Sequence, residues 1–330
     1  MQKTMIYEKP MLNILEDLKK NKLEIVAGDA SFRTFYRIRV KNKKYILIYC
    51  TKEKKNNLET YASINSFLIK NKIVAPKLIK IDLNSNYMIV EDFGNKSYRN
   101  ILSKTKKPLK YYKKIVDTLI NIQKIKINSK SQKVIKNNYS KKILAKESNL
   151  FFQWYVPTRV SKKKIPSFTK KAKKALSKIF SLIKGPNTFF VHRDFHVSNL
   201  MDYKKKVGII DSQDALLGNH AYDIMSLIDD VRIKTTAKLK NKIFNYYVSR
   251  AGKKLAINSK TFQDDFDILS VQRSLKIIGI FYRLYLRDGK KKYLGLIPYT
   301  WSLLHLRLKN PIFREFSKIL NDYLPANKRK

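Results

Sequence analysis

The chain has 330 residues, with 71 Lys plus Arg against 25 Asp plus Glu and a formal net charge of +46. Hydrophobic residues make up 44% and aromatic residues 12%, which excludes a chain that is disordered throughout, and the length predicts two domains or lobes. The single cysteine excludes an internal disulfide, and neither a membrane-spanning run nor a signal-peptide core is present, so we expect a soluble cytoplasmic protein.

The positive charge raises the question of a nucleic-acid partner, because basic surfaces displace counterions from phosphates. Lysines greatly outnumber arginines and are spread from Lys3 to Lys330. Proteins that read phosphates and bases favour arginine for its bidentate geometry. We therefore expect no obligate nucleic-acid partner, although a non-catalytic basic binding protein remains an alternative.

In chain order, the N-terminal pattern predicts a helix at 11–20, strands at 23–26, 35–40 and 45–49, a helix at 57–71 and a strand at 87–90. The loop between the first two strands contains the small residues Gly28, Asp29, Ala30 and Ser31, followed by Phe32 and Arg33. Backbone amides in such a loop can approach phosphate oxygens closely. The end of the last strand, with Val90 and Asp92, suits a hinge against which an adenine base could lie.

Beyond Gly94 the pattern is largely helical, with helices expected at 97–127, 140–152, 168–184, 220–231, 235–251, 261–286 and 310–323. The basic stretches 124–138 and 161–174 are interpreted as solvated connectors. We therefore predict an α+β fold with a small sheet-bearing N-lobe at 1–93 and a larger, mostly helical C-lobe at 94–330.

One short interruption of the helical region carries the chemistry. Asp194 is followed five residues later by Asn199, and Asp211 ends the apolar run 207–210. Two short strands, 200–203 and 207–210, are expected to form a hairpin that returns Asp211 to Asn199. This spacing is typical of kinase-like enzymes, in which an aspartate orients the attacking hydroxyl while amide and carboxylate oxygens hold magnesium.

The triplet therefore predicts a phosphotransferase in which Asp194 is catalytic and Asn199 and Asp211 bind Mg²⁺ beside ATP. We interpret two further residues as structural supports of the catalytic loop. His192 is expected to brace the loop by hydrogen bonds. Asp223, twelve residues after Asp211, is expected to cap or clamp it.

The segments 192–199 and 207–215, with Asp223, resemble the aminoglycoside phosphotransferase-like branch of the protein-kinase-like superfamily. More specifically, 28–33, the stretch from Glu147 through Trp154 and Tyr155, and the late segments 271–281 and 287–290 resemble bacterial N-acetylmuramate/N-acetylglucosamine anomeric kinases. The similarity extends from about residue 22 to 305. It implies a protein-kinase-like bilobal fold.

The resemblance also implies ATP-dependent phosphorylation of the anomeric hydroxyl of an amino sugar, in peptidoglycan recycling, by a protein expected to be a monomer. The loop from Gly28 to Arg33 would then lie over the phosphates, with Glu147, Trp154 and Tyr155 on the sugar side. Glu147 and the two aromatic residues could equally form the packed side of an amphipathic helix. Arg273 and Lys276, spaced i,i+3 on one helix face, could meet the lactyl carboxylate of N-acetylmuramate or pair with acidic neighbours.

The sequence departs from protein kinases in one respect that concerns the phosphates. Protein kinases place a lysine on the third strand to hold them, and here the strand interior reads Ile46, Leu47, Ile48 and Tyr49. An acceptor other than an amino sugar, such as an aminoglycoside, a choline-like or a homoserine-like molecule, remains open, because the fold alone does not select the acceptor.

Overall fold

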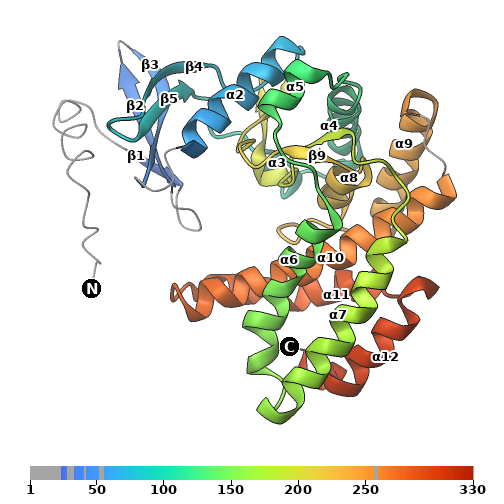
Figure 1. The fold of residues 1–330 in the computed structure, drawn as a ribbon. Helices are drawn as coiled ribbons and strands as arrows, with labels where there is room; N and C mark the ends of the chain where they lie inside the picture. The colour runs from blue at the N-terminus through green and yellow to red at the C-terminus, as the bar shows by residue number, and fades with distance from the viewer. Residues whose placement is uncertain (1–23, 28–32, 41, 52–55, 256–258, 330) are drawn as a thin grey trace.

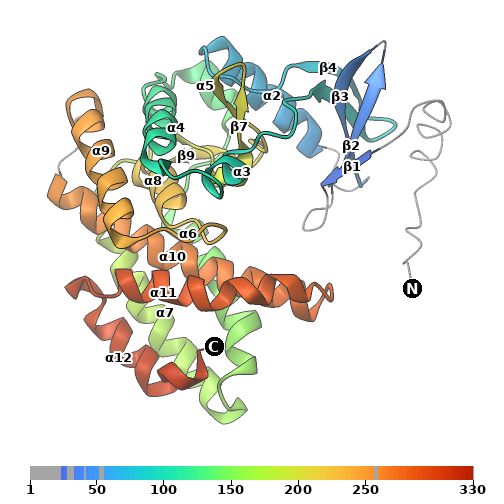
Figure 2. The same cartoon turned by 180° about the vertical axis from the view of Figure 1, so that it is seen from behind.

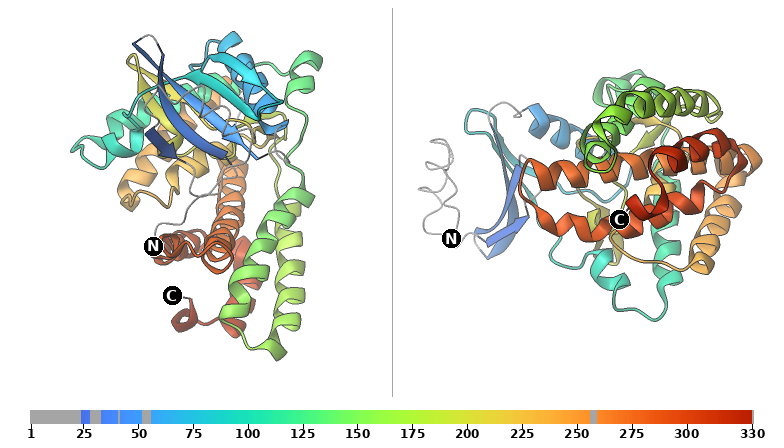
Figure 3. Two further views of the ribbon diagram at one scale, coloured as in Figure 1. Left: turned by 90° about the vertical axis from the view of Figure 1, so that its left-hand side faces the viewer. Right: turned by 90° about the horizontal axis from the view of Figure 1, so that it is seen from below.

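An antiparallel sheet forms the N-terminal part of the molecule. The computed structural model describes residues 24–27, 33–40, 42–51, 56–255 and 259–329. The sheet contains β1 (Glu24–Ala27), β2 (Arg33–Val40), β3 (Lys43–Cys50), β5 (Tyr87–Glu91) and β4 (Leu78–Asp82), in the order β1-β2-β3-β5-β4. It lies at one end of the molecule, next to helix α2 (Asn56–Lys70) (Figures 1 and 3).

Alternation along the strands separates the two faces of this sheet. Tyr36, Leu47 and Tyr87 belong to a cluster on one face, and Ile48 and Met88 belong to a second cluster that includes residues of α2. Successive strand residues point to opposite faces, so both faces carry apolar side chains. Within the described residues, helix α2 covers the face with Ile48 and Met88. The face that meets α2 also turns toward the rest of the chain.

The linker after β5 packs on a second, two-stranded hairpin. Phe93 stacks on Tyr203 with ring centroids 4.2 Å apart, and a Cβ added at Gly208 would lie 2.7 Å from the Phe93 ring. The hairpin consists of β7 (Leu200–Tyr203) and β8 (Lys206–Ile209), as the sequence predicted. Because Gly208 has no side chain, the linker can lie directly against the hairpin.

The remainder of the chain is mostly helical, so the predicted α+β division is confirmed. Figure 2 shows these helices from behind. None of the helices in the described residues is long and apolar enough to cross a bilayer. The helices are α3 (Tyr98–Leu102), α4 (Pro108–Gln123), α5 (Ser129–Val134), α6 (Lys141–Leu150), α7 (Ile165–Ser181), α8 (Ala221–Ile228), α9 (Ala237–Leu255), α10 (Ser259–Leu286), α11 (Ile297–Arg307) and α12 (Arg314–Tyr323).

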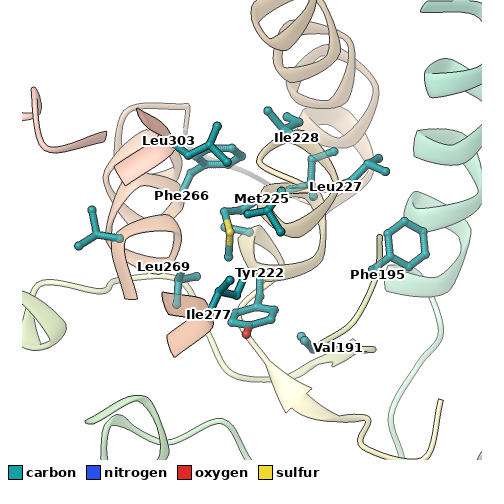
Figure 4. Packing of buried hydrophobic residues seen from close by; sticks show 14 of the residues in the cluster. Val191, Phe195, Tyr222, Met225, Leu227, Ile228, Phe266, Leu269, Ile277 and Leu303 are labelled. Atoms are coloured by element: carbon teal, nitrogen blue, oxygen red, sulfur yellow. The ribbon is translucent and has the colours of Figure 1, made fainter. Parts of the chain in front are cut away.

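Helix α8 is at the centre of the large core, and every one of its residues is buried. Figure 4 shows Tyr222 and Met225 of α8 between Phe266 of α10 and Val191 of the short strand β6 (Phe189–Val191). Strand β6 pairs antiparallel with β9 (Leu216–Gly218). The burial of α8 therefore fixes the position of β6 and of the loop that follows it.

Several element predictions need correction, and each has a local cause. The helix expected at 97–127 divides into α3 and α4, with Pro108 opening the second helix. The stretches interpreted as basic connectors contain α5 and the first turns of α7, which begins beside a proline at Ile165. The sequence pattern did not predict β4, β6, β9 or α11. The helix predicted at 11–20 lies outside the described residues.

Helix α10 approaches α6 closely at Gly279. A Cβ built on Gly279 would lie 2.3 Å from the carbonyl carbon of Leu150, at the end of α6. We expect Gly279→Ala to lower the free energy of unfolding by at least about 1–3 kcal/mol, the usual cost of overpacking. Urea denaturation of the purified protein measures this change.

Gly252 in α9 is the matched control, because an added Cβ there would meet no atom of the described residues within 4 Å. Gly252→Ala should raise the stability slightly, by about 0.5–1 kcal/mol, through its better helix propensity. Equal urea midpoints for the two variants would contradict the close approach of α6 and α10.

Candidate active site

The loop between β6 and β7 is clamped by carboxylates at the two ends of α8. The Asp223 side chain accepts the backbone N–H of His192 at 2.7 Å and that of Arg193 at 3.1 Å. Asp230, just past α8, accepts the backbone N–H of Val197 at 3.1 Å. These bonds matter because a buried N–H group without an acceptor costs about 1–3 kcal/mol.

The loop is also held from the side of the hairpin. His192 is buried, and its Nε2 donates to the carbonyl of Ile210 at 3.1 Å. Arg193 has a φ of 71°, in the left-handed region that non-glycine residues rarely adopt. Burial raises the pKa of Asp223 to about 7, although its two backbone donors favour the ionised form. The loop thus has a strained backbone that the surrounding bonds maintain.

Asp194 follows this strained residue, and its carboxylate has no hydrogen bond or ion pair with any described residue. Burial by itself raises the pKa of Asp194, but the positive charges of Lys276 and Arg273 outweigh it and hold the pKa below its usual range. Burial lowers the pKa of His196 to about 3, so that imidazole is neutral. The Asp194 carboxylate is therefore ionised and available to a ligand.

Asn199 and Asp211 meet across the base of the hairpin. The N–H of Ile210 donates to the Asn199 carbonyl at 3.1 Å, which brings Asp211 next to Asn199. The Asn199 side-chain amide donates to the Asp194 carbonyl at 3.1 Å, and in this assignment its amide oxygen accepts no hydrogen bond from the described residues. Asp211 has a φ of 67°.

These oxygens fit a magnesium ion. Mg²⁺ commonly takes one or two protein ligands and completes its coordination with phosphate oxygens and water. Within the described ranges no group of three or more His, Cys, Asp or Glu side chains could hold a metal by itself. The pair of Asn199 and Asp211 therefore suits a metal that arrives with a phosphate ligand.

Arg33 connects the sheet to this site across the two lobes. From the start of β2 it donates to Asp211 Oδ1 at 2.8 Å and to Gln213 Oε1 at 2.6 Å. The other residues of the predicted phosphate loop, Gly28, Asp29, Ala30, Ser31 and Phe32, lie outside the described residues. Sequence reasoning did not identify Gln213, which carries no motif of its own.

The hinge residues serve the linker. The Asp92 carboxylate pairs with Arg37 through two bonds, of 2.6 Å and 3.2 Å, and accepts the N–H of Gly94 at 2.8 Å. The hydrogen bond to Asp92 raises the pKa of Arg37. Val90 is buried in the apolar cluster under α2. The Asp92 side chain is therefore engaged in fixing the start of the linker.

Glu147 is enclosed by four donors. Its Oε1 contacts Arg193 and accepts from Lys276 at 2.8 Å, and its Oε2 contacts Tyr139 and accepts from Gln272 at 3.2 Å. Burial alone raises the pKa of Glu147, but Lys276 and Arg193 more than offset it, so the pKa lies below its ordinary value. Glu147 thus neutralises two cations beside the catalytic loop.

The two aromatic residues expected on the sugar side differ in position. Tyr155 is fully buried, stacks on Phe151 at 5.1 Å and donates its hydroxyl to the Arg329 carbonyl at 3.0 Å. Its ring has no free face for a sugar in this structure. Trp154 is partly exposed and packs against the main core from the π-helical turn Phe151–Tyr155.

Arg273 is 96% buried, with 4% relative exposure, yet its guanidinium has no hydrogen bond or ion pair with the described residues. It lies one turn before Lys276 on α10 and lowers the pKa of both Asp194 and Asp230 by its charge. A buried cation without a bonded partner is costly. Lys276, which shares a helix face with Arg273 through its i,i+3 spacing, pairs with an acidic neighbour, Glu147, at 2.8 Å.

The description "Phosphotransferase enzyme family" belongs to a family model that matches residues 22–255. The chain belongs to this family. Its geometry agrees, since the match includes the Asp194 loop, the hairpin and Arg33. The predicted branch of the kinase-like superfamily and the enzyme class are thereby confirmed.

Two curated relatives carry the name N-acetylmuramate/N-acetylglucosamine kinase. The protein from Pseudomonas putida is 26% identical over 300 residues, covering 89% of this chain and 85% of its own. The protein from Neisseria meningitidis is 24% identical over 279 residues, covering 84% and 82%.

Solved structures share the fold. An aminoglycoside phosphotransferase in complex with gentamicin is 13% identical, with a TM-score of 0.65, and the alignment covers 91% of this chain and 99% of the other. An ethanolamine kinase from Plasmodium vivax is 15% identical, with a TM-score of 0.63 and coverage of 93% and 86%. The predicted protein-kinase-like bilobal fold is thus confirmed.

Removal of the Glu147 charge tests the cation network. We expect Glu147→Gln to lower the free energy of unfolding at neutral pH by about 3–5 kcal/mol, because Arg193 and Lys276 lose a buried counter-charge. Exposed Glu59 provides the control, and Glu59→Gln should cost less than about 1 kcal/mol. Urea denaturation measures both variants.

The stability difference between wild type and Glu147→Gln should depend on pH. The pKa of Glu147 is depressed in the folded state, so its stabilisation is complete above the unfolded pKa and is lost as the pH falls through the folded value. The difference between wild type and Glu147→Gln should therefore shrink in acid. A difference that stays constant down to the acid limb would contradict the ionised network.

Proposed function

We propose that the enzyme transfers the γ-phosphoryl group of ATP to the anomeric hydroxyl of an N-acetylated amino sugar. The observation that carries this proposal is the ionised Asp194 carboxylate, which has no hydrogen bond or ion pair with the described residues, in a loop whose backbone is bonded to Asn199 and through it to the residue before Asp211. The relatives' names, N-acetylmuramate/N-acetylglucosamine kinase, support the choice of acceptor. Release of these sugars from peptidoglycan would supply the substrate.

In this proposal residues 1–93 and 94–330 form the two lobes, and the nucleotide lies between them. The loop 28–33 covers the phosphates, and the β5 end with Val90 and Asp92 borders the adenine. Asn199 and Asp211 hold Mg²⁺, which neutralises charge on the triphosphate. Asp194 accepts a hydrogen bond from the sugar hydroxyl and aligns its oxygen for attack.

The low pKa of Asp194 bears on its role. A strongly ionised carboxylate is a weak base, so Asp194 contributes mainly by orienting the hydroxyl and receives the proton only as the new P–O bond forms. Lys276 and Arg273 keep the carboxylate ionised over the whole physiological pH range. His192 and Asp223 position the loop and do not contact the sugar.

The charges around Asp194 argue against a cationic acceptor. Arg193 in the catalytic loop and Arg273 and Lys276 of α10 place three cations near Asp194, where Glu147, Asp223 and Asp230 oppose them. An aminoglycoside or a choline-like molecule would meet these cations directly. A neutral or acidic sugar avoids that repulsion, with Trp154 as a candidate packing surface and Glu147 acting through Lys276 and Arg193.

A panel of acceptors tests the reaction. We expect magnesium-dependent release of ADP with N-acetylmuramate or N-acetylglucosamine and none with kanamycin or choline. Asp194→Asn should lower kcat by about 10²–10⁴-fold, the usual contribution of a positioned acid-base group, with nucleotide affinity retained. Asp211→Ala should instead weaken metal-dependent nucleotide binding.

Turnover of Asp194→Asn at the wild-type rate would refute the assignment of Asp194. If the protein binds nucleotide but turns over neither sugar, it would still be assigned as a phosphotransferase, but the proposed amino-sugar acceptor would be rejected.

Arg273 offers a finer test of the acceptor, because N-acetylmuramate differs from N-acetylglucosamine by an acidic lactyl group. The unpartnered guanidinium of Arg273 suits that carboxylate. Arg273→Gln should raise KM for N-acetylmuramate by about 10–100-fold, as expected for loss of a charged hydrogen bond, and leave N-acetylglucosamine nearly unchanged. Equal effects on both sugars in steady-state kinetics would contradict carboxylate recognition.

A further inference from the structure

The third strand lacks the lysine that protein kinases use to hold the phosphates, but a cation is present on the neighbouring strand. In the β2–β3 pairing Phe35 lies opposite Ile48, and Arg33 lies opposite Cys50. Ile48 and Cys50 belong to the apolar cluster under α2. Side chains alternate along a strand, so Arg33, two residues from Phe35 on β2, projects from the same face of the sheet as Phe35 and Ile48.

The contacts of Arg33 lead from this face to the metal-binding carboxylate. Its residue exposure is 5%, while the Asp211 side chain is 31% exposed. The guanidinium bonds to Asp211 at 2.8 Å and to Gln213 at 2.6 Å. Arg33 therefore places a buried cation against the residue that would hold magnesium beside the phosphates.

We propose that Arg33 is the phosphate anchor of this enzyme, an inference that rests on the proposed nucleotide-dependent function. On nucleotide binding, Arg33 exchanges Asp211 and Gln213 for phosphate oxygens of the nucleotide, and Asp211 is released to the metal. A planar guanidinium matches two phosphate oxygens at once, which a lysine on the third strand could not do.

This exchange also accounts for the pairing in the absence of nucleotide. Among the described residues, Arg33 is the cation that pairs with the Asp211 carboxylate, and this ion pair neutralises Asp211. When the nucleotide binds, Arg33 pairs with a negatively charged phosphate and Asp211 pairs with Mg²⁺, so two ion pairs replace one. Charge is therefore balanced in both states.

The competing explanation is that Arg33 only ties the lobes together. A tether would affect the binding of ADP and of adenosine equally, because both ligands depend on the same arrangement of the lobes. A phosphate anchor affects ADP and spares adenosine, which has no phosphate. The comparison of these two ligands separates the explanations.

The experiment is isothermal calorimetry of ADP and adenosine with the full-length protein in the presence of Mg²⁺. We expect Arg33→Gln to weaken ADP by about 10–100-fold, as for a lost charged hydrogen bond, and to leave adenosine unchanged. Arg33→Lys should show an intermediate loss of ADP, because the charge remains and the fork is gone. Arg39→Gln, an exposed position on the same strand, removes the same formal charge and should affect neither ligand.

A second comparison excludes an indirect effect through the unpaired carboxylate. In an Asp211→Asn background, Arg33→Gln should still weaken ADP, because the phosphate contact does not depend on the Asp211 charge. Loss of the effect in that background would overturn the proposal. Equal losses for ADP and adenosine would also overturn it and leave a tether.

If Arg33→Gln binds adenosine, the variant is folded. If Arg33→Gln does not fold, Arg33→Lys tests the proposal instead, through the same comparison of ADP with adenosine. An unchanged ADP affinity in that variant, with adenosine also unchanged, would reject the role of the guanidinium fork. Absence of ADP and adenosine binding by the wild type would instead refute the proposed nucleotide-dependent function.

Discussion

The active-site loop depends on hydrogen-bond acceptors supplied by α8. Between β6 and β7 the chain leaves regular pairing in the interior of the protein, where each backbone N–H needs a partner. Asp223 and Asp230 provide those partners from the two ends of one helix. The carboxylates can do so because α8 is packed on all sides and cannot shift.

Electrostatic balance in the same region follows from that placement. Buried Asp223 lies near Asp194, and buried Asp230 lies near His196 of the same loop, so carboxyl groups gather in a space of low polarity. Arg273 and Lys276 from α10 oppose them, and Glu147 from α6 limits the excess of positive charge. Because water is largely excluded from this region, each buried carboxylate needs a nearby cation to compensate its charge, and each buried cation needs a carboxylate.

The two lobes meet through polar contacts as well as through packing. Ser212 donates to Asn65 of α2 at 2.7 Å, and Arg33 reaches Asp211 and Gln213 from β2. Both contacts end on the segment that follows β8. Both contacts therefore join the N-terminal lobe to the residues around Asp211, and in the proposed function they would couple the nucleotide site to the catalytic loop.

The sequence by itself determined the α+β order, the hairpin and the grouping of Asp194, Asn199 and Asp211, because these features depend on short spacing and local alternation. It also marked 271–281, which includes Arg273, Lys276 and Gly279. Only the tertiary structure placed Glu147 within a closed set of donors and buried Tyr155 among other rings. Those outcomes depend on contacts between α6, α10 and the catalytic loop, which are distant in sequence. The partnership of Arg33 with Asp211 likewise joins residues 178 positions apart, and no local pattern encodes such a pair.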